Sequence, residues 1–96
     1  MKESHEKVAA RLIERAEEVV TKVVDQGSWP HLDLEGAEVS HVELVTEFRR
    51  TGVGAKHWRV IIRGIPSDEE RFKARVRDAL RHEFHEAHPL EIHTEL

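Results

Sequence analysis

The sequence predicts an α+β domain, a two-layer α/β sandwich in which two helices cover one face of a three-stranded mixed sheet. Three observations support this prediction. Two segments carry apolar residues at helical spacing, three segments alternate apolar and polar residues, and the order along the chain is α-β-β-α-β. Because 96 residues suffice for one core only, we expect a single domain that spans residues 1–96.

The first helix is expected to begin after Ser4, whose hydroxyl suits an N-cap, and to end at Gly27. One apolar stripe between them repeats at steps of three and four residues, which indicates an amphipathic helix. The stripe comprises Ala9, Leu12, Ala16, Val19 or Val20, and Val23. The segment 28–37 that follows has no regular period. Its apolar residues, which we expect to cover the open end of the core, are Trp29, Leu32 and Leu34.

Residues 38–50 and 56–65 are expected to form an antiparallel hairpin around the glycine-containing connection 51–55. One register places Phe48 opposite Trp58 on the first face and Glu47 opposite Arg59 on the second. The same register pairs Thr46 with Val60, Leu44 with Ile62, Glu43 with Arg63 and Val45 with Ile61. Apolar residues then share one face and opposite charges meet on the other, so this register is the prediction.

The second helix is expected to follow Pro66, because Ser67 and Glu70 have the spacing of a capping box. Its apolar stripe comprises Phe72, Val76, Ala79, Leu80, Phe84 and Ala87. Pro89 excludes a helix immediately before it. Residues 90–96 alternate between apolar and polar types, which predicts a half-buried strand parallel to the strand that it joins.

The uncovered face of the predicted sheet is polar and faces water. It carries Glu43, Glu47, His57, Arg59, Arg63, Glu91, His93 and Glu95. Val45 and Ile61 form its apolar centre. We expect any homodimer to use this open face or an exposed strand edge.

Composition excludes several classes of partner. The formal net charge is −4 with both signs interspersed, whereas nucleic acid requires a concentrated basic face. The chain has no cysteine, and no apolar run approaches the ~20 residues of a membrane span. The first residues also lack the apolar core of a signal peptide. We therefore expect a soluble, cytoplasmic protein that binds neither nucleic acid nor a membrane.

Histidine is the residue type that most suggests a site, since the chain has eight. Steps of three residues bring neighbouring imidazoles close together on a helix, and zinc binds imidazole and carboxylate groups. The candidate ligands are His82, His85, His88 and His93, with Glu83 or Glu86 as a carboxylate partner. The alternative is a solvated helix end, where charged histidine complements the helix dipole. His41 and His57 lie too far apart in the predicted hairpin to share one ion.

No catalytic arrangement stands out. The serines lie at caps or beside turns, and none has the G-x-S-x-G context of an activated nucleophile. Carboxylates opposite arginines are expected to have a lowered pKa rather than the raised pKa of a general acid. The segment 52–56 lacks the spacing of a phosphate-binding loop. We therefore expect no enzymatic activity.

Residues 45–96 resemble the C-terminal cytosolic domain of cation diffusion facilitators, which are zinc and manganese exporters. That domain has the same element order, and it closes with a strand similar to Ile92-His93-Thr94-Glu95; its hairpin turn is similar to Arg50-Thr51-Gly52. The differing positions are Leu96, where the family has proline, and Arg59 and Phe72, near which it has histidines. The resemblance implies a metal-responsive regulatory domain in which only His93 carries over.

The chain also resembles computationally designed α+β proteins. The helix start Pro66-Ser67-Asp68-Glu69-Glu70, the complementary hairpin faces and the regular alternation are typical of such proteins. This resemblance implies a stable, non-enzymatic fold without natural biochemical activity, which is the first functional hypothesis. The alternatives are the metal-binding domain and a protein-interaction module that uses the open face or a strand edge.

Overall fold

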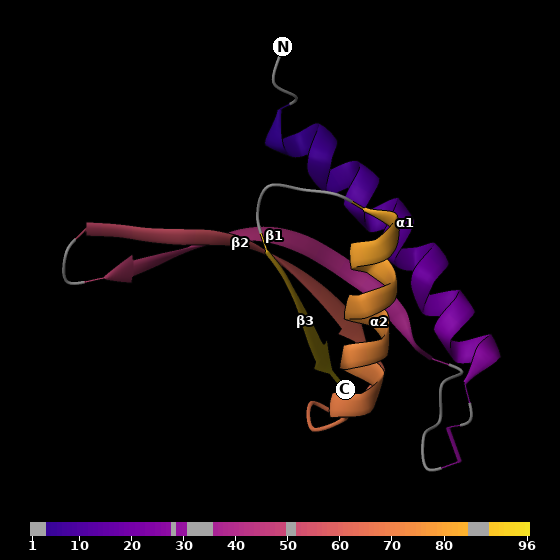
Figure 1. Ribbon diagram of the computed structural model, residues 1–96. Coiled ribbons are helices and arrows are strands. Elements are labelled where there is room, and N and C mark those ends of the chain that lie inside the picture. The colour runs from indigo at the N-terminus through magenta and orange to yellow at the C-terminus, as the bar shows by residue number, and fades with distance from the viewer. Residues whose placement is uncertain (1–3, 28, 31–35, 50–51, 85–88) are drawn as a thin grey trace.

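The computed structural model describes residues 4–27, 29–30, 36–49, 52–84 and 89–96, with the backbone alone at 47–49, 52–53 and 55. Its elements are α1 (His5–Gln26), β1 (Glu38–Arg49), β2 (Gly52–Arg63), α2 (Glu70–Glu83) and β3 (Leu90–Glu95) (Figure 1). β1 pairs with β2 antiparallel, β3 pairs with β2 parallel, and β2 is the central strand. The predicted fold class, element order and parallel last strand are confirmed.

The predicted register of the hairpin is wrong. Leu44 rather than Phe48 lies opposite Trp58, and Glu43 rather than Glu47 lies opposite Arg59. In the same way, the partners of Val60, Ile62, Arg63 and Ile61 are Val42, Val39, Glu38 and His41. The sequence Glu-Leu at 43–44 is repeated as Glu-Phe at 47–48, and an even shift keeps every side chain on its face. Both registers therefore satisfy the same pattern of charges and apolar residues.

The predicted connection at residues 51–55 is also wrong, because β2 already begins at Gly52 and ends at Arg63. The register shifts once between Thr46 and Phe48, where the extra residue is on β2, and once between Val39 and His41, where it is on β1. Glycine is tolerated in a strand at such bulges. The two glycines that suggested a loop are therefore part of the strand.

α1 begins as predicted, with the Ser4 hydroxyl accepting a hydrogen bond from the Lys7 backbone at 3.4 Å. The buried stripe comprises Val8, Leu12, Ala16, Val19, Val20 and Val23. Gly27 ends the helix in an extended conformation (φ −94°) rather than the left-handed one typical of a terminal glycine. A Cβ atom there would collide with the Trp29 indole, whose Nε1 donates to the Val23 carbonyl at 3.0 Å. Gly27 therefore makes room for Trp29.

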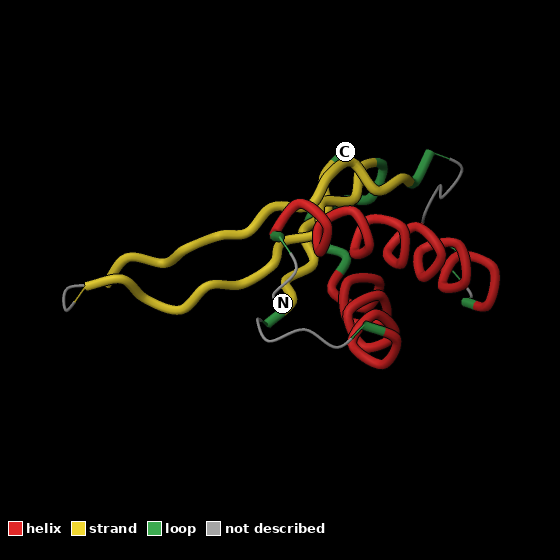
Figure 2. The backbone as a smooth tube through the Cα atoms, turned by 90° about the horizontal axis from the view of Figure 1, so that it is seen from above, coloured by secondary structure: helices red, strands yellow, loops and turns green. Residues whose placement is uncertain are grey.

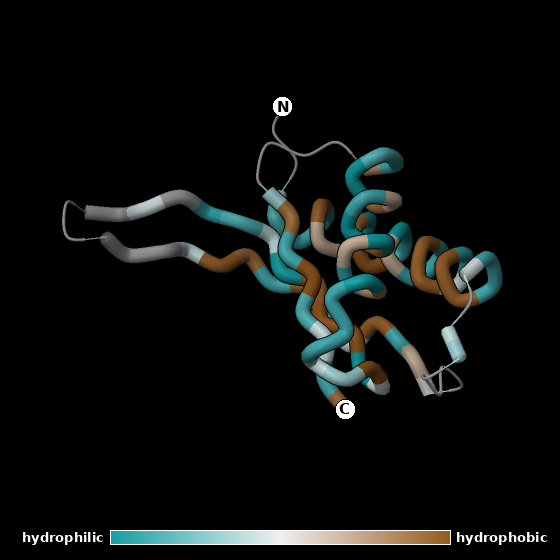
Figure 3. The backbone as a smooth tube through the Cα atoms, turned by 60° about the horizontal axis from the view of Figure 1, so that its bottom comes forward, coloured by the Kyte–Doolittle hydropathy of each residue, from teal (hydrophilic) through white to brown (hydrophobic). Residues whose placement is uncertain are grey.

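One hydrophobic core joins both helices to the sheet. It includes Trp58, Val60 and Ile62 of β2, Leu90 and Ile92 of β3, and Phe72, Val76 and Leu80 of α2, besides the α1 stripe. Figure 3 shows these apolar segments where helices and strands meet. Trp29 packs edge-on against Phe72 with ring centroids 5.4 Å apart, so it covers the core as predicted. Leu32 and Leu34 lie outside the described residues.

The predicted capping box of α2 is wrong, because the helix begins at Glu70 without a side-chain cap. The residues before it form a turn in which the Pro66 carbonyl accepts from the Glu69 backbone at 3.2 Å. The Thr94 hydroxyl, only 1% exposed, donates to the same carbonyl at 2.9 Å. This contact from β3 fixes the turn, so the chain enters the helix later than Ser67.

β3 follows the predicted alternation, with Leu90, Ile92 and Thr94 buried. Leu96 does not continue it: β3 ends at Glu95, and Leu96 is 89% exposed. α2 ends at Glu83, and Phe84 has extended backbone angles. Ala87, the last residue of the predicted helical stripe, lies outside the described residues.

Candidate interaction surface

β1 is an edge strand, because within the described residues it pairs with β2 on one side only. Its free backbone groups can be assigned from β2, where the Trp58 N–H donates to the Pro89 carbonyl at 2.8 Å, on the β3 side. Backbone groups alternate in direction along a strand, so Arg59 points toward β1 and its partner Glu43 points back toward β2. Between the two register shifts, the residues of β1 whose N–H and C=O groups point outward are therefore Val42, Leu44 and Thr46, a row that we call the β1 edge.

The side chains of the β1 edge lie at the margin of the core. Val42 and Leu44 pack against the core but are only half-buried. Their partners across the ladder, Val60 and Trp58, are 0% and 2% exposed. The core is thus closed over β2 and open along β1. Partly exposed apolar side chains beside outward backbone groups are the combination that strand addition uses.

In the described part of the chain, no third strand pairs with the far part of the hairpin. β3 pairs only with residues 58–63 of β2, so residues 45–49 and 52–57 form a two-stranded ribbon. Figures 1 and 2 show this ribbon projecting well beyond both helices. A two-stranded hairpin without a packed face is marginally stable in water. The ribbon therefore depends on the rest of the sheet or on a partner for its order.

The open face carries a network of charged side chains from all three strands. Arg59 donates through Nε to Glu91 Oε2 at 3.0 Å and through Nη1 to Glu43 Oε1 at 3.2 Å. His57 Nε2 lies 2.7 Å from the same Oε2 atom of Glu91. Arg63 pairs with Glu95 at 3.2 Å. The predicted polar face is present, with partners drawn from β3 as well as β1; the Glu47 side chain is outside the description.

The network changes the acidity of its members. Burial raises the pKa of Glu91, but the hydrogen bonds and positive charges of Arg59 and His57 outweigh this and leave the pKa below its ordinary value. The hydrogen bond with Glu91 raises the pKa of Arg59 further. Both groups are therefore held in their charged forms, as expected for ion pairs and unlike a catalytic acid.

The predicted apolar centre of the open face offers little surface to a partner. Val45 lies opposite His57 rather than Ile61. Ile61 is only 7% exposed, although it lies outside the main core. The open face is thus apolar beneath and charged above, which suits contact with water better than self-association.

The two candidate metal ligands within the described residues, His82 and His93, lie in different layers of the fold. His82 lies on α2, whereas His93 is exposed on the open face, 3.7 Å from Glu95. His85, His88 and Glu86 lie outside the described residues. His41 and His93 flank Ile61 from the two outer strands. Among the described residues, no group of three or more potential ligands is placed to hold an ion.

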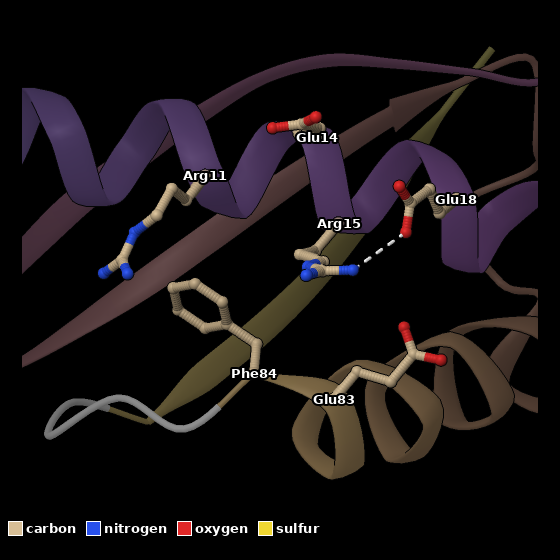
Figure 4. A pocket seen from close by; sticks show the side chains of 6 residues that line it. All are labelled: Arg11, Glu14, Arg15, Glu18, Glu83 and Phe84. Carbon is tan, nitrogen blue, oxygen red and sulfur yellow. Dashed lines mark hydrogen bonds and ion pairs between the residues drawn. The ribbon is translucent and has the colours of Figure 1, made fainter.

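A hollow of about 340 Å³ lies between α1 and the end of α2 (Figure 4). The Arg11 guanidinium lies 5.8 Å from the Phe84 ring centre, and Arg15 bonds Glu18 at 3.2 Å. The hydrogen bond from Lys22 to Glu83, 2.9 Å long, lowers the pKa of Glu83. Charges of both signs line the hollow, and Arg15 and Glu18 pair within it, so it favours no class of ligand.

Sequence reasoning missed the β1 edge because it gave no strand order. With the hairpin strands paired to each other, either of them can occupy the centre of the sheet, and the free edge depends on that choice. The half-buried state of Val42 and Leu44 could not be predicted either, since both have the alternation of fully buried positions.

Comparison with known proteins adds no relative. No family model matches the chain, and no curated protein or solved structure matches it. Neither helix in the described part of the chain combines the length and apolarity of a membrane span. The resemblances to designed proteins and to the cation diffusion facilitator domain stay predictions, and functional inference depends on the geometry of the chain itself.

Proposed function

We propose that this chain is a protein-interaction module that binds an extended segment of another polypeptide along the β1 edge. The added strand forms hydrogen bonds with the outward backbone groups of Val42, Leu44 and Thr46, and it covers the half-buried side chains of Val42 and Leu44. The supporting observation is that outward backbone groups and partly exposed core side chains coincide at Val42 and Leu44.

The expected affinity is moderate. Each backbone hydrogen bond contributes about 0.5–1.5 kcal/mol net, and three outward residues offer as many as six such bonds. Covering apolar surface adds about 25 cal/mol per Å². Ordering an extended segment offsets much of this gain, so we expect dissociation constants of about 1 μM.

The test is a selection of ten-residue random peptides on the immobilised domain, with affinities measured by interferometry. We expect enriched peptides to bind wild type and to lose at least about tenfold on Thr46→Pro, which removes one outward N–H and no bond to β2. Thr46→Ala is the matched control and should keep the affinity. Peptides that bind Thr46→Pro and wild type equally, or no enriched peptides, would contradict the proposal.

A second candidate is the stable fold without natural activity that the likeness to designed proteins implies. The paired charges of the open face favour it, since Arg59 joins Glu43 and Glu91 in a surface that suits water. Under this candidate the β1 edge binds nothing and thermal unfolding is independent of any added ligand. The peptide selection therefore separates the two.

A further inference from the structure

We infer that the strand taken up at the β1 edge is β1 of a second copy of this chain, antiparallel to the first, with Leu44 opposite Leu44 of the partner subunit. The inference rests on the proposed function, because it names the occupant of the same edge. Two copies related by a twofold axis present the same strand to each other, so the interface must be self-complementary.

The backbone limits the possible registers. An outward residue of one copy has to lie opposite an outward residue of the other. Because outward and inward residues alternate along β1, the twofold axis has to pass through a residue of β1 rather than between two residues. An axis at Glu43 places this carboxylate opposite Glu43 of the partner subunit. An axis at Val45 places Glu43 opposite Glu47 of the partner subunit. Like charges directly opposite each other destabilise a strand pair, which leaves axes at Val42, Leu44 and Thr46.

The extent of the β1 edge decides among these three. An axis at Leu44 maps the row Val42, Leu44 and Thr46 onto itself, so each outward residue meets another outward residue of the row. It pairs Val42 with Thr46 of the partner subunit and covers both half-buried apolar side chains. An axis at Thr46 moves Val42 beyond the partner's strand, which ends at Arg49. An axis at Val42 places residues 47–49 beyond the start of the partner's strand at Glu38.

The Leu44 register also supplies what the ribbon lacks. Residues 45–49 of one copy then lie beside residues 39–43 of the other, which adds a third strand along β1 where β3 does not reach on β2. A ribbon that is marginal as a two-stranded hairpin becomes part of a three-stranded sheet. Each copy stabilises the projecting hairpin of the other.

The first test is the oligomeric state of the full chain, measured by sedimentation velocity from about 0.1 to 100 μM, a range that brackets the affinity expected for strand addition. We expect a dimer that Leu44→Arg converts to monomer, because the two new charges would face each other. Leu96→Arg is the matched control: it makes the same change at a leucine that is 89% exposed after β3, and it should remain dimeric. Circular dichroism checks that both variants are folded.

The second test reads the register and does not depend on Leu44→Arg folding. The chain has no cysteine, so Val42→Cys, Leu44→Cys and Thr46→Cys each introduce a single thiol. Only the residue on the axis lies within disulfide distance of its own copy. We expect Leu44→Cys to form an intermolecular disulfide under mild oxidation and the other two to remain reduced.

A disulfide formed preferentially by Val42→Cys or Thr46→Cys would overturn the inferred register. A chain that is monomeric throughout the concentration range, with no cross-link at any position, would overturn the inferred partner. Neither result bears on the peptide selection. A monomer whose peptide binding is lost in Thr46→Pro would leave the proposed function standing without the dimer.

Discussion

Both edge strands of the sheet direct backbone N–H and C=O groups outward, but the side chains of their outward residues differ in burial. Beside β3, the Pro89 carbonyl accepts from Trp58 of β2, and the Glu95 carbonyl accepts from Gly64, which follows β2. The outward residues of β3 are therefore Leu90, Ile92 and Thr94. These three are 8%, 6% and 1% exposed, whereas the outward residues of the β1 edge are all half-buried. β3 has six residues and β1 has twelve. Within the described residues both edges have outward backbone groups, so side-chain burial and strand length are the reasons why we propose β1 as the edge for a partner.

The largest expected difference between the edges is in the cost of truncating a side chain. Ile92→Ala removes a buried side chain and should lower the free energy of unfolding by about 3 kcal/mol. Leu44→Ala removes a half-buried one and should cost about half as much when the protein is dilute. Urea denaturation at about 1 μM, near the expected dissociation constant or below it, measures both. Equal costs would show that the core is as closed at β1 as at β3.

A threonine on each edge gives a sharper comparison. Thr94→Val removes the buried hydrogen bond to the Pro66 carbonyl and should cost about 1–2 kcal/mol. Thr46→Val makes the same change at a half-buried position of the β1 edge, and we expect a change within about 0.5 kcal/mol of zero. Urea denaturation of both variants measures the two changes in the free energy of unfolding. A cost at Thr46 equal to that at Thr94 would contradict the difference in burial.

The charged network links the two edges through β2, and its effect should be smaller. Glu91→Gln removes the carboxylate that Arg59 and His57 share, and we expect a loss below about 1 kcal/mol at pH 7, because partly exposed ion pairs are screened by solvent. Glu43→Gln is the matched control on β1, where one bond to Arg59 is lost. It should cost less.

The pH dependence of that loss has a defined sign. The folded-state pKa of Glu91 lies below its ordinary value of 4.5, so the carboxylate stabilises the fold above about pH 5. This contribution disappears as the pH falls through 4.5 and below the folded-state pKa. The difference between wild type and Glu91→Gln should therefore shrink as the pH falls below about 5 and vanish in stronger acid. A difference that grows in acid would contradict a lowered pKa.

The sequence predicted what depends on local patterns. The element order, the Ser4 cap and the alternation of β3 each follow from a few neighbouring residues. The register failed because Glu-Leu and Glu-Phe recur four residues apart, which leaves two pairings with the same faces. The start of α2 failed because Thr94, distant in sequence, fixes the turn before it. The candidate surface depends on strand order, which local patterns do not contain.

The smallest expected effect is the change in melting temperature on addition of zinc. This measurement tests whether the functional residues lie on β3 rather than on β1. His93 on β3 carries the likeness to cation diffusion facilitators, but it is exposed on the open face, whereas α2 and His82 belong to the layer packed on the core. We therefore expect the melting temperature to be unchanged, within error, when zinc is added in tenfold excess over EDTA-treated protein. A tight site would instead stabilise the fold by about 2.7 kcal/mol at a free zinc concentration of 100 times its dissociation constant. A stabilisation of that size, lost in His93→Ala and kept in His82→Ala, would assign the function to β3 and the metal-binding hypothesis would replace strand addition.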